Sequence, residues 1–389
     1  MYKRQIYIDP PFFSKANYDA SIRLDSKKTD HLPALKYLAY EDVWEQGLGS
    51  YLKMLCTRLY LIRDLLSDNG TVWVHLDWHA VHYVRILMDE IFGMDHFVNE
   101  IIWTYKSGGT SKKYFARKHD TILVYSKNKD YYFNILKEKS YNRGMRPYHF
   151  KGVKEYKDEV GWYTMVNMKD VWQIDMVGRT SSERNGYATQ KPEALLERIL
   201  ACSTKQGDIC ADFFSGSGTL AAVAQRMGRR WIACDSEKLA IHCATKRLLQ
   251  IKEKTPICLL KEKLDADDSG YELFVEVEEK EVAGSRTKAL SIELKGYKAI
   301  DLGKNLDEEG QKVIRKVAEI DPLQLIEYWS VDFHYDGMVH RPDTVFSRQN
   351  GILTQSCQVL LKEAEKGAII SIKAADVLGN HVYRFIDRR

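Results

Sequence analysis

The chain has 389 residues, of which 44% are hydrophobic and 29% charged, the balance of a globular protein with two or three domains. No apolar run approaches the roughly 20 residues that span a bilayer, and the N-terminus lacks the apolar region of a signal peptide, so a membrane protein is not expected. The net charge of +4 decides little by itself.

The first predicted element is a strand over the short apolar run Gln5–Ile8. The prolines of Asp9-Pro10-Pro11 cannot continue a strand or a helix, so the chain turns after Asp9. The polar stretch that follows, as far as Glu45, is expected to be a long loop.

The next elements alternate between helix and strand. Apolar residues at helical spacing predict a helix from Leu48 to Leu66, ended by Asp68-Asn69-Gly70. Thr71–Leu76 is typical of a buried strand, and a second helix is expected from His79 to Phe92. Strands are then expected at 101–105 and 121–125.

The middle of the chain is basic and aromatic. Lys106–Pro147 contains eleven Lys or Arg and three Asp or Glu, an excess of +8, and nine aromatic residues lie in Tyr114–Phe150. Cations interleaved with aromatics favour a nucleic-acid surface over an ordinary solvated one. Because Tyr131–Tyr187 also lacks sustained periodicity, we expect it to be an inserted recognition segment.

Strands and helices alternate again after the insert. Pro192 opens a helix, followed by a strand at 208–214, a helix at 220–227, a strand at 231–235 and a helix at 237–251. This alternation predicts a parallel sheet with helices on both faces.

The C-terminal part has a different pattern. Glu262–Glu281 carries nine acidic and two basic residues, an excess of −7, and Glu262–Ser269 is an expected domain boundary. Strands are expected at 271–277, 289–294, 368–373 and 381–385, which predicts a small α+β domain. It has no catalytic set that we can identify.

A glycine-rich turn suggests a nucleoside site. Phe214–Thr219 follows a strand and opens a helix, so backbone N–H groups face a ligand that can approach the main chain closely. Asp235, at the end of the next strand, is placed to accept hydrogen bonds from two ribose hydroxyls. The third glycine of a dinucleotide fingerprint and a Gly-Lys-Ser/Thr phosphate loop are both missing. An adenosine cofactor without pyrophosphate, S-adenosylmethionine, fits best.

Asp9-Pro10-Pro11-Phe12 suggests a reaction at an amino group. The lone pair of an amino group on a nucleobase is delocalised into the ring. A carboxylate and a main-chain carbonyl that accept its two hydrogens would draw the lone pair toward a methyl donor, and would stabilise the positive charge of the transition state. Phe12 would stack on a base swung out of the duplex. Taken alone, this stretch is more simply a proline turn with a core phenylalanine.

Taken together, these motifs resemble the β-class of DNA amino-methyltransferases, in which the catalytic motif precedes the cofactor motif. The chain is also similar to modification subunits of type III restriction systems. The matching stretches are Asp9–Phe12, His75–His79, Thr189–Pro192 and Asp212–Thr219. The resemblance implies a seven-stranded Rossmann-like α/β sheet, with an inserted target-recognition region and the small C-terminal α+β domain.

The resemblance also assigns roles to residues. It implies a catalytic site of Asp9, Pro10, Pro11 and Phe12. It implies cofactor contacts from Thr189, Gln190, Lys191, Pro192, Asp212, Phe214, Ser215, Gly216, Ser217, Gly218, Thr219 and Asp235. The expected regions are 1–130 (catalytic half), 131–187 (target recognition), 188–255 (cofactor-binding half) and 256–389 (C-terminal domain).

The sequence allows more than one interpretation of the specificity and completeness of the site. An acidic first motif residue with phenylalanine in fourth place resembles adenine-N6 enzymes, and cytosine N4 is the alternative. Family members usually carry a further stretch before the catalytic strand, and here only five residues precede Ile6. One interpretation is a truncated product that lacks a wall of the cofactor pocket and acts as an inactive DNA-binding subunit. Methylation of RNA or of a protein glutamine is a third possibility.

Partners and weaker sites follow from the same residues. Phosphate contacts with double-stranded DNA are expected from a loop that carries Lys106, Lys112, Lys113, Tyr114, Arg117 and Lys118. His75, Asp77 and His79 are expected to organise the sheet edge rather than to bind a metal. The C-terminal domain is a candidate dock for a restriction subunit or a second protomer. The seven cysteines, with no close pair, are expected to be buried thiols in a reducing cytoplasm.

Overall fold

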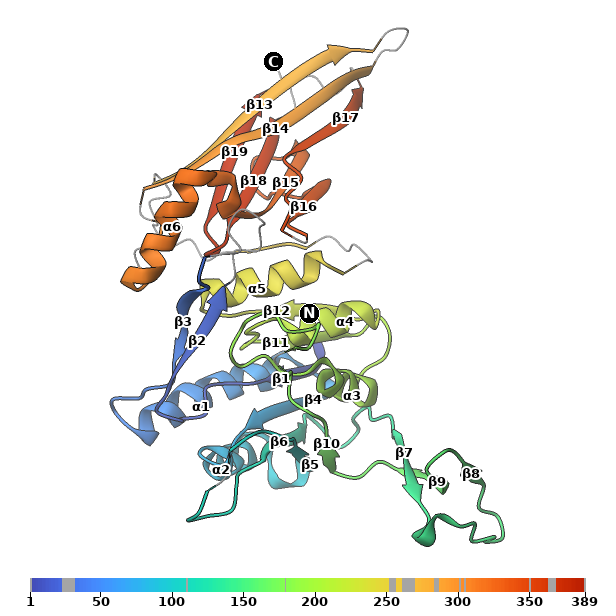
Figure 1. The fold of residues 1–389 in the computed structure, drawn as a ribbon. Helices are drawn as coiled ribbons and strands as arrows, with labels where there is room; N and C mark the ends of the chain where they lie inside the picture. Colours follow the sequence, from blue (N-terminus) through green and yellow to red (C-terminus); the bar gives the residue numbers. More distant parts are fainter. Residues whose placement is uncertain are drawn as a thin grey trace.

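The computed structural model describes residues 2–22, 32–109, 111–178, 180–251, 257–260, 270–282, 287–300, 302–303, 306–349, 351–362 and 369–387. The expected boundary at Glu262–Ser269 lies outside these residues. The described chain forms a central sheet covered by helices, a small projecting sheet, and a C-terminal β-rich domain (Figure 1).

The central sheet has seven strands, in the order β10-β5-β6-β4-β1-β11-β12. Their bounds are β1 Lys3–Ile8, β4 Leu66–Leu76, β5 Phe97–Thr104, β6 His119–Ser126, β10 Val171–Gln173, β11 Ile209–Asp212 and β12 Arg230–Ala233. Strands β4, β1, β11 and β12 are parallel, and β6 is antiparallel to both of its neighbours. The seven-stranded, Rossmann-like α/β sheet expected from the sequence is thus confirmed.

Helices cover both faces of this sheet. They are α1 Leu48–Leu65, α2 Val81–Phe92, α3 Glu193–Ser203, α4 Thr219–Arg226 and α5 Lys238–Leu249. Side chains alternate along β1, so Ile6 and Ile8 pack with α1 and α2, while Tyr7 packs with α3 and α4. Burial on both faces explains why these strands are continuous apolar runs. Among the described helices, none is long and apolar enough to cross a membrane.

The sequence predicted a long loop before Glu45, but the structure has two strands there. Strands β2 (Asn17–Ile22) and β3 (Leu35–Glu41) pair antiparallel as a hairpin. It is held at both ends by distant partners: Ala20 packs with Tyr187, and Leu35 enters the core of the C-terminal domain. The hairpin was missed because the partners that bury its apolar residues lie far along the chain.

Strand β4 begins five residues earlier than Thr71, so Asp68-Asn69-Gly70 lies inside it. The backbone of β1 explains the glycine, because a Cβ on Gly70 would lie 2.9 Å from the carbonyl oxygen of Arg4. The helix stops where expected, but strand pairing begins at once.

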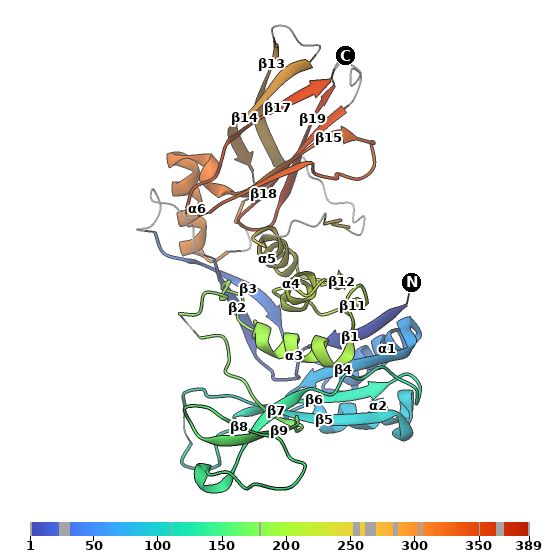
Figure 2. The same ribbon diagram turned by 90° about the vertical axis from the view of Figure 1, so that its right-hand side faces the viewer.

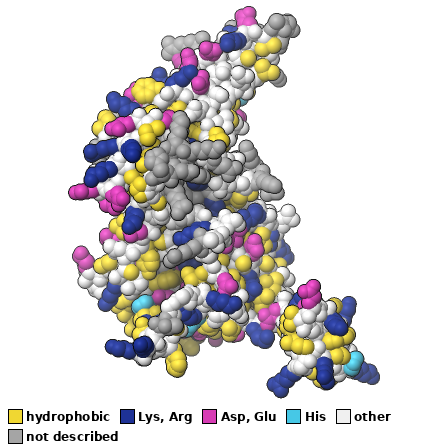
Figure 3. All heavy atoms as spheres, viewed as in Figure 1, with side chains coloured by type: hydrophobic (Ala, Val, Ile, Leu, Met, Phe, Trp, Pro, Cys, Tyr) yellow, Lys and Arg dark blue, Asp and Glu magenta, His cyan; other side chains and the backbone are white. Residues whose placement is uncertain are grey.

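The segment between Tyr131 and Tyr187 contains two kinds of structure. Strands β7 (Lys137–Tyr141), β8 (Glu155–Lys157) and β9 (Trp162–Asn167) form a small sheet that projects from the molecule, and Lys and Arg side chains gather on it at the lower right of Figure 3. Strand β10 instead joins the edge of the central sheet. Its Trp172 is buried, and the Trp172 and Trp73 ring centroids lie 6.3 Å apart.

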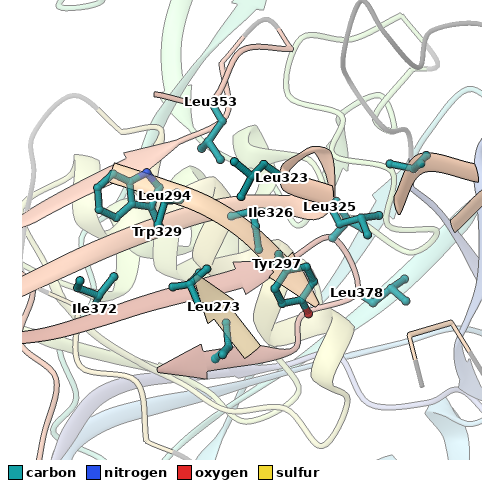
Figure 4. Close-up of a cluster of buried hydrophobic side chains, with 14 of the residues drawn as sticks. Leu273, Leu294, Tyr297, Leu323, Leu325, Ile326, Trp329, Leu353, Ile372 and Leu378 are labelled. Carbon is teal, nitrogen blue, oxygen red and sulfur yellow. The ribbon is translucent and has the colours of Figure 1, made fainter. Parts of the chain in front are cut away.

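The C-terminal domain packs two antiparallel sheets and a helix around one core. The first sheet contains β13 (Tyr271–Glu281), β14 (Thr287–Ala299) and β17 (Ser356–Lys362), and the second contains β15 (Ile326–Tyr335), β16 (Thr344–Ser347), β18 (Ile369–Asp376) and β19 (His381–Asp387). Leu294, Trp329 and Ile372 meet in the core (Figure 4). Helix α6 (Glu308–Ile320) is preceded by its N-cap Asp307, whose side chain accepts a hydrogen bond from the Gly310 amide.

Helix α5 lies between the central sheet and the C-terminal domain in both ribbon views (Figures 1 and 2). On its C-terminal-domain side the ring of His242 stacks on Tyr328, with centroids 6.1 Å apart. Lys246 and Glu327 form an ion pair of 2.6 Å beside this stack. The two parts therefore share a packed junction.

The cysteines are less buried than the sequence suggested. Cys202 and Cys210 are buried thiols, as expected. Cys234 and Cys258 are exposed, so the expectation is wrong for them. Cys234 directly follows β12, the last strand of the sheet, where nothing in the sheet covers it on one side.

Candidate active site

The candidate active site is a pocket of about 800 Å³ at the carboxyl ends of the central strands. Strands β1 and β11 are adjacent and parallel, with Tyr7 opposite Asp212 in the register. Asp9 and the glycine turn, about two hundred positions apart in sequence, therefore end side by side. Most of the expected residues line this one cavity: Asp9, Pro10, Pro11, Phe12, Thr189, Gln190, Lys191, Asp212, Phe214, Ser215, Gly216, Ser217, Thr219 and Asp235.

Two residues expected at the cofactor support the site from outside the cavity. Pro192 precedes the first turn of α3 as its N-cap. Gly218 precedes α4 in a left-handed conformation with φ of 73°, and a Cβ there would lie 2.6 Å from that of Ala244. A glycine is needed at 218 because α5 packs against this turn, whatever ligand the pocket holds.

Asp9 has one occupied oxygen and one free oxygen. Its Oδ2 atom forms an ion pair with the ammonium group of Lys191. Its Oδ1 atom is buried and has no hydrogen-bond partner in the described part of the chain. His75 Nδ1 approaches Oδ1 to 3.9 Å, too far for a hydrogen bond. A buried acceptor without a donor costs stability, so this atom is a candidate contact for a ligand.

A buried hydrogen-bond chain lies behind Asp9. The Tyr7 hydroxyl and His75 Nδ1 are 2.7 Å apart, and His75 Nε2 is 3.1 Å from Asp120. The Tyr105 hydroxyl donates to the other oxygen of Asp120 at 3.0 Å. Burial raises the pKa of the Asp120 carboxyl, but His75, the Lys191 charge and the Tyr105 hydrogen bond together outweigh burial and leave that pKa below its usual value. These hydrogen bonds fix the side chains beneath Asp9. They also give both ring nitrogens of His75 a partner other than Asp9.

His79 and Asp77 do not join His75. The backbone and ring of His79 both bond to Asp77, with Nδ1 at 2.7 Å from Oδ2. Asp77 thus closes the turn before α2, and it also lines the pocket. The expected role at the sheet edge matches this geometry.

The loop after Phe12 is held by Asp42, which the sequence analysis missed. Its carboxylate accepts hydrogen bonds from the amides of Phe12 and Phe13, both at 3.1 Å, and of Ser14 at 2.6 Å. Phe13 has a φ of 62°, a left-handed conformation that costs a non-glycine residue about 1–2 kcal/mol. Asp42 is fully buried and offsets that cost. A single aspartate in a polar stretch gave no signal of this role.

The ring of Phe12 is fixed at the pocket by two neighbours. Its centroid lies 5.8 Å from that of His75, and the Lys191 ammonium lies 5.3 Å from the same centroid. Asp42 sets the backbone direction of Phe12 through its amide. The aromatic face is therefore part of the pocket wall beside Asp9.

The glycine turn offers polar groups to a ligand. The Ser215 hydroxyl is buried and has no hydrogen-bond partner among the described residues. The Gly216 amide donates to Asp235 at 2.8 Å, which ties the turn to the end of β12. Burial raises the pKa of Asp235 above its usual value. Burial also raises the pKa of Asp212 well above its usual range, although the Phe214 amide donates to it.

Other pocket residues were missed by the sequence analysis. Glu237 lines the cavity two positions after Asp235, and burial raises the pKa of its carboxyl. Asp235 already accepts two backbone amides, so Glu237 is a second candidate acceptor for hydroxyl groups. Tyr18 and Tyr40 of the β2–β3 hairpin stack at 4.8 Å and form another wall. Glu237 could have been suspected from the strand-end position; the tyrosines could not, because the hairpin itself was unexpected.

The segment Thr189–Pro192 serves the Asp9 side of the pocket as well as the glycine turn. The Thr219 hydroxyl donates to the Lys191 carbonyl at 3.1 Å, which fixes the backbone that carries the Lys191 ammonium to Asp9. The Gln190 side chain accepts from the Asn185 amide and donates to the Glu183 carbonyl. Gln190 therefore shapes the chain before α3.

The expected DNA-binding residues do not line the pocket but extend from its rim. Tyr105 and Asp120 both line the cavity, and Lys106, Lys112, Lys113, Tyr114, Arg117 and Lys118 lie between them in sequence. Lys118 donates to the Ser107 hydroxyl at 2.8 Å. The Arg117 guanidinium lies 3.7 Å from the ring centroid of Trp78.

Comparison with known proteins identifies a family. Residues 4–246 match the family model of N6 and N4 methyltransferases, described as DNA methylase. The type II methyltransferase M2.DpnII of Streptococcus pneumoniae is 36% identical over 191 residues, which is 48% of this chain and 63% of that protein. The type II methyltransferase M.HpaI of Haemophilus parainfluenzae is 28% identical over 244 residues, covering 62% and 67% of the two chains. The chain thus spans less than two thirds of the length of M2.DpnII.

Solved structures show similar matches at lower identity. The PvuII DNA methyltransferase (cytosine-N4-specific) matches 65% of this chain and 83% of its own, with 16% identity and a TM-score of 0.43. The M1.HpyAVI–SAM complex matches 64% of this chain and 90% of its own, with 18% identity and a TM-score of 0.40.

Proposed function

The chain belongs to the DNA methylase family, and on that premise we propose that it transfers a methyl group from S-adenosylmethionine to adenine N6 in duplex DNA. The observation that carries the proposal is the free Oδ1 atom of Asp9. It is buried and lacks a donor among the described residues, and Asp9 lines the same cavity as the glycine turn. An exocyclic amino group brings the donor that this atom needs.

Asp9 activates the amino nitrogen as a nucleophile. When Oδ1 accepts one N–H, it draws the nitrogen lone pair out of the ring, and it stabilises the positive charge that grows on nitrogen during transfer. Lys191 holds Oδ2, so both oxygens then have donors. The Pro10 carbonyl accepts the second amino hydrogen. Because a base inside the DNA double helix cannot reach this cavity, the target base leaves the duplex and stacks on Phe12.

The methyl donor is S-adenosylmethionine, which supplies an electrophilic methyl group on sulfonium when bound. The glycine turn fits such a ligand because Gly216 lets it approach the backbone and because the Ser215 hydroxyl, which has no partner among the described residues, can bond it. Asp235 and Glu237, which line the pocket, would accept hydrogen bonds from the ribose hydroxyls. The amino nitrogen would form its bond to the methyl carbon as the bond from that carbon to sulfur breaks, so S-adenosylhomocysteine would leave and the surplus amino proton would pass to Asp9 and then to water. No residue of the chain needs to form a covalent bond to the base.

We also propose a place in restriction and modification, as the names of the relatives suggest. Those names are of type II enzymes, and the resemblance to type III modification subunits stays a prediction. Pairing with a restriction subunit or a second protomer likewise stays a prediction. The basic loop at the pocket rim supports DNA as the substrate over a protein glutamine.

Transfer of an isotope-labelled methyl group tests the proposal. The purified chain is incubated with S-adenosylmethionine that carries a deuterated methyl group and with plasmid DNA, RNA or protein, and products are identified by mass spectrometry. The expected product is labelled N6-methyladenine in DNA, whereas labelled N4-methylcytosine would favour the cytosine alternative. DNA binding without calorimetric binding of the cofactor would favour an inactive subunit instead.

A further inference from the structure

We propose that Phe115 inserts into the DNA base stack and fills the gap left by the extruded target base; this inference rests on the proposed function. Phe115 lies in the connection between the end of β5 at Thr104 and the start of β6 at His119, within its described residues 111–118, at the pocket edge of the central sheet. This role differs from phosphate contact by the neighbouring cations, because it places one apolar side chain inside the duplex.

The connection between β5 and β6 starts and ends at the pocket rim. Tyr105 and Asp120 flank it, both line the cavity, and their side chains are hydrogen bonded at 3.0 Å. The Tyr105 amide donates to the Lys118 carbonyl at 3.2 Å, which closes the base of the loop. A group carried by this segment is therefore tethered at the place where a target base enters.

Phe115 is the most exposed large hydrophobic side chain in the described part of the chain, with 99% of its surface accessible. Its neighbours are braced: the Arg117 guanidinium lies 3.7 Å from the ring centroid of Trp78 and 4.9 Å from that of Tyr114. The fold thus holds the segment while leaving the phenylalanine ring open to water. A fully exposed ring suits a partner that offers apolar faces, as stacked bases do.

The positive charge around Phe115 indicates that its partner is DNA. Residues 111–118 contain four Lys or Arg and no Asp or Glu. Such a segment approaches phosphates, and an apolar side chain within it can enter between base steps, as apolar residues do in proteins that kink DNA. An anionic membrane offers similar chemistry, but the tether to a base-sized pocket favours DNA.

The experiment compares paired and unpaired targets. Extrusion of the target base must overcome base pairing and stacking, and its free-energy cost is smallest for an unpaired base. One duplex carries the target base correctly paired, and a second carries it opposite an abasic site, both within a sequence that the wild-type chain methylates. Phe115→Ala is expected to lower kcat/KM about 30-fold on the paired duplex and less than about threefold on the unpaired one, the range of one base–aromatic stack.

Two further variants control the result. Phe115→Trp keeps an aromatic ring and is expected to restore most of the rate on the paired duplex. Met94→Ala removes another highly exposed hydrophobic side chain, 73% accessible, which precedes β5 at the opposite end of that strand, and is expected to change neither rate. The unfolding midpoint of Phe115→Ala should match the wild type, because the exposed ring does not stabilise the fold.

Each alternative result has a distinct meaning. Wild-type rates for Phe115→Ala on the paired duplex, or equal losses on both duplexes, would overturn the inference. Loss of binding to phosphatidylserine vesicles with an unchanged methylation rate would overturn it in favour of a membrane. If the wild-type chain binds S-adenosylmethionine but methylates no DNA, the proposed function fails first, and the assignment of Phe115 falls with it.

Discussion

Asp376 in the C-terminal domain and Asp9 in the central pocket are both shielded carboxylates, but their oxygen atoms have different partners. Asp376 accepts hydrogen bonds from the Leu378 and Asn380 amides, the Asn380 side chain and the Tyr297 hydroxyl. Asp9 has the Lys191 ion pair on one oxygen and, in the described chain, no donor on the other. One carboxylate is complete in the folded chain, whereas the other is complete only with a ligand.

The same contrast extends to the two regions. Within the described residues of the C-terminal domain, no buried side-chain nitrogen or oxygen lacks a partner, whereas the pocket has two such atoms, on Asp9 and Ser215. An unsatisfied buried polar atom costs about 1–3 kcal/mol. Polar groups of the C-terminal domain therefore stabilise its fold, whereas two polar atoms of the pocket are candidates for ligand contact. Other unpartnered atoms of the described chain lie outside the pocket, on Arg4, Gln5, Tyr51, Asn185 and His242.

The largest expected effect tests the pocket side. Asp9→Asn keeps the size of the side chain and an oxygen for Lys191 but removes the negative charge beside the amino group. We expect kcat to fall about a thousandfold, as when a preorganised electrostatic interaction is removed from a reacting centre, with little change in the unfolding midpoint. Methyl-transfer kinetics and thermal unfolding measure the two. If the variant retains more than about a tenth of the activity, the Asp9 carboxylate does not act in the reaction and the contrast with Asp376 is wrong.

Asp376→Ala should show the reverse pattern. The change leaves the Tyr297 hydroxyl and the amides of the β18–β19 turn without their acceptor. The free energy of unfolding is expected to fall by about 3 kcal/mol, while kcat/KM of the folded protein stays at the wild-type value. Denaturant titration gives the first quantity. An unchanged midpoint, or a selective loss of activity, would place Asp376 with the functional groups.

His242 sharpens the comparison, because its Nδ1 atom also lacks a partner among the described residues but lies at the domain junction. Burial lowers the pKa of His242 from 6.5 to about 4. Between these values the unfolded chain binds the proton and the folded chain does not, so the contribution is complete above pH 6.5 and is lost as pH falls toward 4. At about 1.4 kcal/mol per pKa unit, it amounts to about 3 kcal/mol.

Unfolding as a function of pH measures this contribution. His242→Gln, which cannot take up the proton, should flatten the stability curve between pH 6.5 and about 4 and leave methyl transfer at about pH 8 unchanged. If its curve has the wild-type slope, another group controls the acid sensitivity. If methyl transfer falls instead, unsatisfied atoms outside the pocket would also be functional.

Asp42 lies between the two types, because it is fully bonded yet holds a functional loop. Asp42→Ala should release Phe12 and Phe13 from their fixed backbone and lower kcat about 30-fold, since small misplacements at a reacting centre are costly. Calorimetric affinity for S-adenosylmethionine should change less than about threefold, because the glycine turn is separate. Asp42→Asn, which keeps one acceptor, should recover part of kcat. An equal loss of cofactor affinity would indicate general collapse of the pocket.

The smallest effect concerns the rim. Replacing both Lys112 and Lys113 by alanine should weaken DNA binding and lower the slope of log affinity against log salt by about two, because each lysine that neutralises a phosphate adds roughly one to that slope. Cofactor affinity serves as the control and should not move. An unchanged slope would mean that these lysines do not bind phosphate.

Local chemistry explains what the sequence could predict. Prolines after Asp9 and glycines at 216 and 218 fix the backbone where they stand, and apolar strands fix the sheet, so the two halves of the pocket could be placed together in advance. The β2–β3 hairpin could not be predicted, because Ala20 and Leu35 are buried by partners far along the chain. Asp42 was missed for the same reason: the backbone amides that it holds lie about thirty residues earlier in the chain.

Modified bases in cellular DNA test the central claim most directly. Nucleosides are prepared from DNA of cells that express the wild-type chain or Asp9→Ala at matched protein levels, and methylated bases are quantified by mass spectrometry. We expect N6-methyladenine above background with the wild-type chain alone. No methylated base in either culture, or equal amounts in both, would contradict a methyl-transfer site built on Asp9.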